Sequence, residues 1–147
     1  MNTARPGHLK KLAFYVASAL ITTSLFQSCA HSMEFLTSSI VPAAEGSVKI
    51  KIDKNNNYKI ELKVIRLAAP TRLDPQKNVY VVWMKTEQNG IKNIGELKTS
   101  GHMLSKMLKS SLITVTPYKP SGFFITAEND ANISDPIGQV VLSTGTR

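Results

Sequence analysis

Apolar and polar residues alternate along much of the chain after residue 46, with the period of two that is typical of β-strands. The densest apolar stretch is 78–84 (Asn-Val-Tyr-Val-Val-Trp-Met), which contains Trp83, the only tryptophan. Because both faces of this stretch are apolar, it is predicted to be a central strand that is covered on both sides. We expect it to form the middle of an antiparallel β domain, with Trp83 as the largest packing element.

A hairpin is predicted on the N-terminal side of this strand. The alternating runs 48–52 and 58–64 enclose the polar segment 53–57, whose Asp and Asn residues favour a tight turn. The Asp-x-Asn-x-Asn spacing that begins at Asp53 is also the opening of a calcium-binding loop. However, tyrosine and valine stand where that loop needs glycine and a bidentate glutamate, so the turn is favoured.

On the C-terminal side, the Asn-Gly pair at 89–90 is a strong turn signal and predicts a hairpin between the central strand and 91–97. Further strands are predicted at 112–115, 123–128 and 138–143. The segment 101–109 has an apolar spacing that suits a short helix and a strand equally well. About seven short strands with regular turns predict an all-β fold, an immunoglobulin-like antiparallel β-sandwich.

The first residues have the pattern of a secretory signal peptide. Residues 1–11 are short and basic, and an apolar run follows at 12–21. The run is too short for a transmembrane anchor, and Ser and Thr follow it directly. We therefore expect a signal peptide at 1–28, a tether at 29–46 and the β-sandwich domain at 47–147. Part of the tether is apolar and is expected to pack against the domain as an edge strand.

The end of the signal peptide decides how the protein is held. Residues 25–29 (Leu-Phe-Gln-Ser-Cys) resemble a bacterial lipoprotein box, in which Cys29 would become the acylated N-terminal residue, although the leucine lies one position early. The competing interpretation is cleavage after Ala30, because Ser28 and Ala30 are both small. Cys29 is the only cysteine, so it has no internal disulfide partner, and its position favours acylation.

The residues after the cysteine bear on the membrane that holds the protein. In lipoproteins of Gram-negative bacteria, an Asp after the cysteine commonly retains the protein at the inner membrane, and Ala30 and His31 stand here instead. We therefore expect an outer-membrane lipoprotein that faces the periplasm and contacts the membrane through its lipid anchor. The expected partner is an envelope protein or a cell-wall component.

The net charge of +8 changes this interpretation little. Three positive charges, Arg5, Lys10 and Lys11, belong to the signal peptide, and from Cys29 onward 15 Lys and Arg stand against 10 Asp and Glu. These charges are spread along the predicted strands, which favours a solvated, mildly basic surface. A weak attraction to anionic envelope surfaces is the second interpretation. A nucleic-acid partner is not expected.

Few residues of the chain suggest catalysis. The histidines are too scattered for a metal site: His8, His31 and His102. A hydrolase would need a paired-carboxylate cleft, whereas Glu128, Asp130 and Asp135 are expected in one exposed polar region. Five aromatic residues could form a ligand face, although packing is the favoured role of most: Tyr58, Tyr80, Tyr118, Phe123 and Phe124. We expect no enzymatic activity, no cofactor and no small-molecule substrate.

Four short motifs occur in order in the second half of the chain: 78–83, 94–97, 124–128 and 136–143. The series resembles the extracytoplasmic C-terminal domain of anti-sigma-K-type factors, which has a Tyr-x-x-Trp strand, a Gly-x-Leu strand, a strand with Thr-x-Glu and a closing Pro-x-Gly-x-x-Val-Leu. The resemblance covers about residues 70–145 and implies a β-sandwich without catalytic residues. It also implies a structural core that includes Tyr80, Trp83, Gly95, Leu97, Phe124 and Gly138.

The chain departs from that family at its N-terminal end. Anti-sigma factors place a cytoplasmic sigma-binding domain and a transmembrane helix before the sandwich, whereas a signal peptide is expected here. The resemblance therefore implies the fold and not sigma-factor binding. The favoured hypothesis is a non-enzymatic envelope lipoprotein whose sandwich binds or supports a partner at the membrane. The alternative is an accessory or sensory module of an envelope-stress system of the anti-sigma kind.

Overall fold

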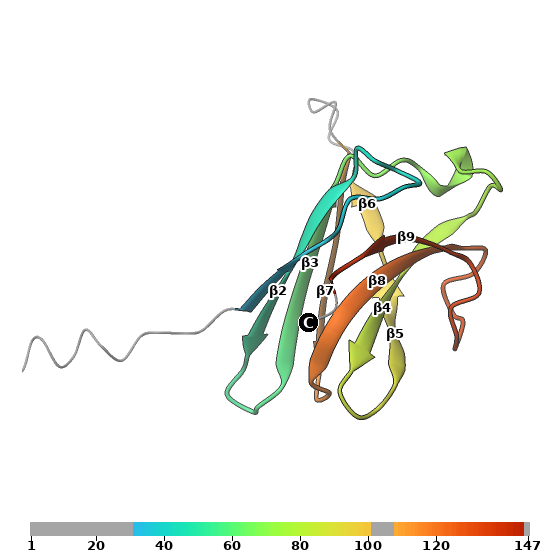
Figure 1. Cartoon of the computed structure of the whole chain (residues 1–147). Helices are drawn as coiled ribbons and strands as arrows, with labels where there is room; N and C mark the ends of the chain where they lie inside the picture. Colours follow the sequence, from blue (N-terminus) through green and yellow to red (C-terminus); the bar gives the residue numbers. More distant parts are fainter. Residues whose placement is uncertain (1–30, 101–107, 146–147) are drawn as a thin grey trace, which may run out of the picture.

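The computed structural model describes residues 31–100 and 108–145. The expected signal peptide, Cys29, His102 and most of the segment 101–109 lie outside the described residues. Within the described residues the chain forms β-strands and a 3₁₀ turn, Pro70–Arg72, but no α-helix (Figure 1). The strands are β1 (His31–Glu34), β2 (Glu45–Ile52), β3 (Tyr58–Ile65), β4 (Val79–Thr86), β5 (Ile91–Glu96), β6 (Lys98–Ser100), β7 (Lys109–Thr116), β8 (Pro120–Glu128) and β9 (Gln139–Ser143).

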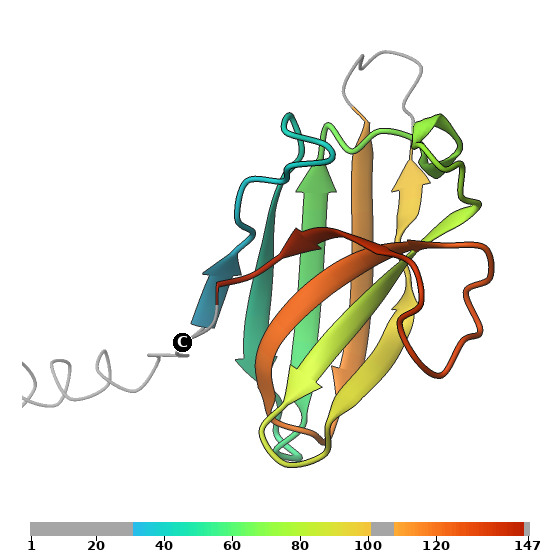
Figure 2. The same cartoon turned by 45° about the vertical axis from the view of Figure 1, so that its right-hand side comes forward.

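The strands form two antiparallel sheets packed face to face (Figure 2). One sheet has five strands in the order β1-β2-β3-β7-β6, and the other has four in the order β5-β4-β8-β9. The order β2-β3-β7-β6 matches strands A-B-E-D of an immunoglobulin domain, and β5-β4-β8-β9 matches C′-C-F-G. The predicted immunoglobulin-like antiparallel β-sandwich is therefore confirmed. All seven predicted strands are present, and β6 is an edge strand that was not predicted.

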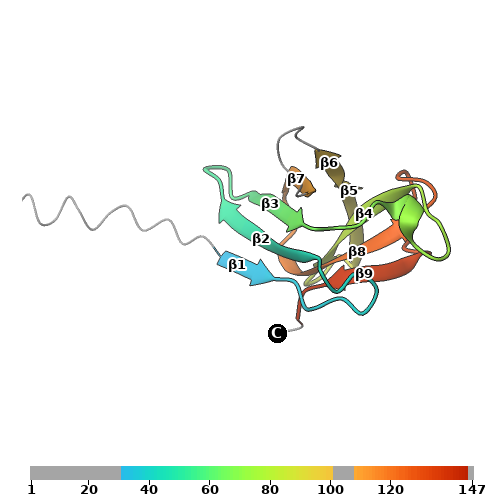
Figure 3. The same ribbon diagram turned by 90° about the horizontal axis from the view of Figure 1, so that it is seen from above.

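The segment 31–46 belongs to the sandwich. Its first four residues form β1, which lies beside β2 at the edge of the sheet (Figure 3). In this pairing His31 lies opposite Ile50. Phe35 then bridges to Thr144 and links the edges of the two sheets. Val41 is 8% exposed and is part of the core. The expectation that part of the predicted tether packs as an edge strand is confirmed, and the folded domain includes residues before 47.

The core between the sheets follows the period-two pattern of the sequence. The five-stranded sheet contributes Val48, Ile50, Ile60, Leu62 and Val64, which alternate with polar residues along β2 and β3. From the four-stranded sheet come Tyr80, Val82, Met84, Phe123 and Ile125. Each of these side chains is at most 6% exposed. The predicted hairpin 48–64 is also confirmed, and Asp53 Oδ1 accepts hydrogen bonds from the backbone N–H groups of Asn55 (2.8 Å) and Asn57 (2.9 Å) in its turn.

The central strand β4 is covered on both faces, as predicted. Trp83 is the largest fully buried side chain, but it points away from the five-stranded sheet. It forms a second, smaller core with Val81 and Phe124, and its ring centroid lies 6.2 Å from that of Phe124 in a stacked arrangement. Ile133, in the loop between β8 and β9, packs against this cluster. That loop therefore covers the outer face of the four-stranded sheet.

Candidate functional site

An apolar cleft of about 430 Å³ opens between the two sheets, next to β1. Met33 on β1 and the Ile50–Ile52 end of β2 line one wall, and Tyr58 stands at the start of β3. Pro120, at the start of β8, contributes the opposite wall. Ile52 has the inward register of the core residues of β2, yet it is 61% exposed. An inward-facing isoleucine stays accessible because it lines this open cleft.

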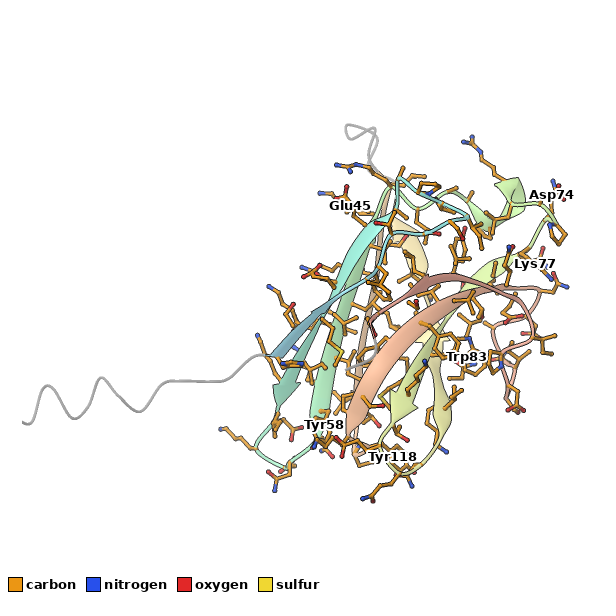
Figure 4. All side chains as sticks on the ribbon, in the orientation of Figure 1. Glu45, Tyr58, Asp74, Lys77, Trp83 and Tyr118 are labelled. Atoms are coloured by element: carbon orange, nitrogen blue, oxygen red, sulfur yellow. The ribbon has the colours of Figure 1, made fainter. Side chains whose placement is uncertain are left out.

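The rim of the cleft is polar and is fixed by an ion pair. Lys119 Nζ lies 2.8 Å from Glu87 Oε1, and the backbone N–H of Glu87 donates a hydrogen bond to the carbonyl oxygen of Lys119. The carboxylate of Glu87 raises the pKa of Lys119 above its usual value by accepting a hydrogen bond from it. His31 and Ser121 complete the rim. Figure 4 shows Tyr58 and Tyr118 at this end of the sandwich.

The cleft has the chemistry of a binding site for apolar groups. In clefts of this kind, apolar side chains of the protein line the interior and contact apolar parts of the ligand. A few polar groups fix the orientation of the ligand. Among residues 31–100 and 108–145 there is no group of three metal-ligating side chains. In the same ranges, no helix is long and apolar enough to cross a bilayer.

The five aromatic candidates do not form one ligand face. Tyr80, Phe123 and Phe124 are buried, as packing residues are. Tyr80 donates a hydrogen bond from its hydroxyl to the carbonyl oxygen of Ala68 (2.9 Å), and burial raises its pKa to about 12. Tyr58 lines the cleft. Tyr118 is 39% exposed, and the ammonium group of Lys92 lies 5.5 Å from its ring centroid.

The expected exposure of Glu128 is wrong. Glu128 is 4% exposed, and its Oε1 accepts hydrogen bonds from Thr126 Oγ1 (2.7 Å) and from the backbone N–H of Gly138 (2.8 Å). Trp83 Nε1 donates in turn to Thr126 Oγ1 (2.8 Å). Asp130 and Asp135 are exposed, as predicted. The carboxylate of Glu128 therefore holds the end of the β8–β9 loop against the sheet. The local sequence, in which a charged residue is followed by a polar segment, does not indicate this role.

The structure places the six predicted core residues in two kinds of position. Tyr80, Trp83, Leu97 and Phe124 are buried. The two glycines instead occupy positions where a side chain would be strained or would clash. Gly95 has φ +127° at an irregularity in the β4–β5 pairing, and a Cβ on Gly138 would lie 1.9 Å from the carbonyl oxygen of Ala127.

Sequence reasoning missed the cleft. Met33, Ile50 and Ile52 share one face of the paired strands β1 and β2, and that common register is the signal that could have indicated it. Comparison of the chain with known protein families, with curated proteins and with solved structures found no match.

Proposed function

We propose that this protein is a non-enzymatic cell-envelope lipoprotein of a Gram-negative bacterium. It is anchored by acyl chains on Cys29, lies at the outer membrane facing the periplasm, and binds a protein partner there. The observation that carries this proposal is the apolar cleft beside β1, which is lined by His31 and Met33. His31 and Met33 lie two and four residues after Cys29 in the chain.

The distance between anchor and domain is short. Only Ala30 separates Cys29 from the first residue of β1. Two residues of extended chain span at most about 7 Å. The sandwich is therefore held against the bilayer surface, and a partner in the cleft is held there with it.

The chemistry of the cleft fits an extended protein segment with apolar side chains. β1 is the outermost strand of its sheet, so its free edge offers backbone hydrogen-bonding groups to an added strand. Met33, Ile52 and Pro120 offer apolar surface to the side chains of such a segment. Glu87, the carboxylate at the rim, is engaged by Lys119. This arrangement supports binding without a chemical step.

Site-specific photo-crosslinking in living cells tests the proposal. A photoreactive residue at Ile52, in the cleft, is expected to give one discrete protein adduct in the membrane fraction. The matched control is Ile137, which is 83% exposed and is not among the cleft residues. Adducts of equal yield and identity at both positions would contradict binding in the cleft. An adduct with an anti-sigma protein would favour the alternative function, an accessory role in an envelope-stress system.

A further inference from the structure

The outer face of the five-stranded sheet carries a concentration of lysines. Residues that are paired across an antiparallel ladder share one face, and the pairs Lys49↔Glu61, Lys51↔Lys59 and Lys63↔Ser47 define the face opposite the core. Lys98 pairs with Ser111 of β7, which itself pairs with Lys63. The residues named here as the lysine face are Lys49, Lys51, Lys59, Lys63, Lys98 and Lys109.

The six lysines of this face outnumber its acidic residues two to one. Its acidic residues are Glu34, Glu45 and Glu61. Glu61 forms a salt bridge with Lys59 at 2.9 Å, and Glu45 pairs with Arg66. Four exposed lysines make no salt bridge among the described residues: Lys49, Lys51, Lys63 and Lys98. Lys59 lowers the pKa of Glu61 through its hydrogen bond. Lys51 and Lys63 are also close enough to Glu61 to lower its pKa, but none of the four forms a salt bridge among the described residues. The face therefore presents several exposed ammonium groups in one plane.

Two large apolar side chains stand among these lysines. Ile113 is 64% exposed and lies opposite Glu61, and Val115 is 55% exposed and lies opposite Lys59. β-strands with one wet face usually carry polar residues there, so exposed isoleucine and valine on β7 are unusual. Lysines with apolar side chains between them are typical of surfaces that rest on lipid headgroups, where cations meet phosphates and apolar groups enter the interface.

The position of the anchor matches this face. β1 is the edge strand of the same sheet, and Cys29 lies two residues before it. We propose that the lysine face lies flat on anionic phospholipid headgroups of the membrane that holds the anchor. This inference rests on the proposed function, because the acylated Cys29 brings the face to the bilayer. The apolar cleft opens between the sheets and not on this face, so a partner reaches it from the side.

The contact is measured on the mature, acylated full-length protein in vesicles. A Ser111→Cys variant carries a fluorophore in the middle of the face, and acylation leaves this cysteine as the only free thiol. A Ser134→Cys variant, in the exposed loop over the other sheet, is the matched control. Acrylamide is expected to quench the Ser111 label several-fold less in vesicles of phosphatidylglycerol and phosphatidylcholine than in phosphatidylcholine alone. High salt is expected to remove the difference, and the Ser134 label is expected to be quenched equally in all vesicles.

Charge variants show whether the lysines cause the contact. Each lysine near an anionic surface is expected to favour the membrane-bound orientation about fivefold. Replacing Lys49, Lys63 and Lys98 together by Ser is therefore expected to lower the ratio of molecules with the face on the membrane to molecules with the face in solution roughly 100-fold. Replacing Arg72, Lys77 and Lys85 by Ser removes the same charge from other surfaces and is expected to leave the ratio unchanged. Circular dichroism confirms that both variants are folded.

The outcomes separate the two proposals. Protein that does not float with phosphatidylcholine vesicles lacks the anchor and contradicts the proposed function. Protein that floats, but whose Ser111 label is quenched equally with and without phosphatidylglycerol, contradicts the lysine face. Shielding of Ser111 that depends on protein concentration and not on anionic lipid would identify a second copy of the chain as the occupant and would also overturn the inference.

Discussion

Replacement of Trp83 by Ala tests how the outer core is held. Trp83 is fully buried, stacks on Phe124 and is covered by the loop that carries Ile133. Truncation of a buried tryptophan to alanine costs about 3–5 kcal/mol, because transfer free energy is lost and a cavity remains. Typical domains have a total stability of about 5–15 kcal/mol. We therefore expect Trp83→Ala to lower the free energy of unfolding by about 3–5 kcal/mol.

The assay is equilibrium unfolding in urea followed by far-UV circular dichroism, since the variant has lost the only tryptophan fluorophore. Trp83→Phe is the matched control. It keeps an aromatic ring beside Phe124 and loses the Nε1–H donor to Thr126, which contributes roughly 1 kcal/mol. A loss of less than 1 kcal/mol in Trp83→Ala, or equal losses in the two variants, would refute a packed second core.

Three further predictions concern the same sheet. Glu128→Ala is expected to lose about 1–3 kcal/mol in urea unfolding, because the Thr126 hydroxyl and the backbone N–H of Gly138 lose their acceptor. The exposed Asp135→Ala should change nothing measurable, and equal effects would contradict the role of Glu128. Gly138→Ala should destabilise more than Gly90→Ala, because a Cβ at Gly138 would lie 1.9 Å from the carbonyl oxygen of Ala127 and a Cβ at Gly90 would meet no atom within 4 Å. The reverse order of stability would contradict this argument. Burial raises the pKa of Tyr80 to about 12, above an unfolded value of about 10. The contribution of Tyr80 to stability should therefore be present below pH 10 and be lost as pH rises through 12. A Tyr80→Phe variant that loses the same stability over this range would show that other groups cause the loss.

The sequence predicts elements well where a local pattern decides their structure. Alternation along 48–64 determines which side chains of the first hairpin are buried, and β2 and β3 follow it. The edge strand β6 is three residues long and depends on pairing with β7, which the local pattern does not encode. Trp83 shows the same limit. Both faces of β4 are apolar, so periodicity alone does not tell which face meets the other sheet.

The candidate site was harder to predict because it depends on how the two sheets meet. Met33, Ile52 and Pro120 come from three strands, and only the packed sandwich brings them to one cleft. The lysine face is different, since the alternation along β2 and β3 already places their lysines on one side. Its extension to Lys98 requires the pairing of β6. The resemblance to anti-sigma-K-type factors and the acylation of Cys29 stay predictions.

Intact mass and membrane fractionation of the mature protein test the central claim most directly. We predict a protein that begins at Cys29, carries the added mass of acyl chains and sediments with the outer membrane. The Cys29→Ser variant should lack that acyl mass. An unmodified protein that begins at His31 and stays in the soluble fraction would contradict the lipoprotein account.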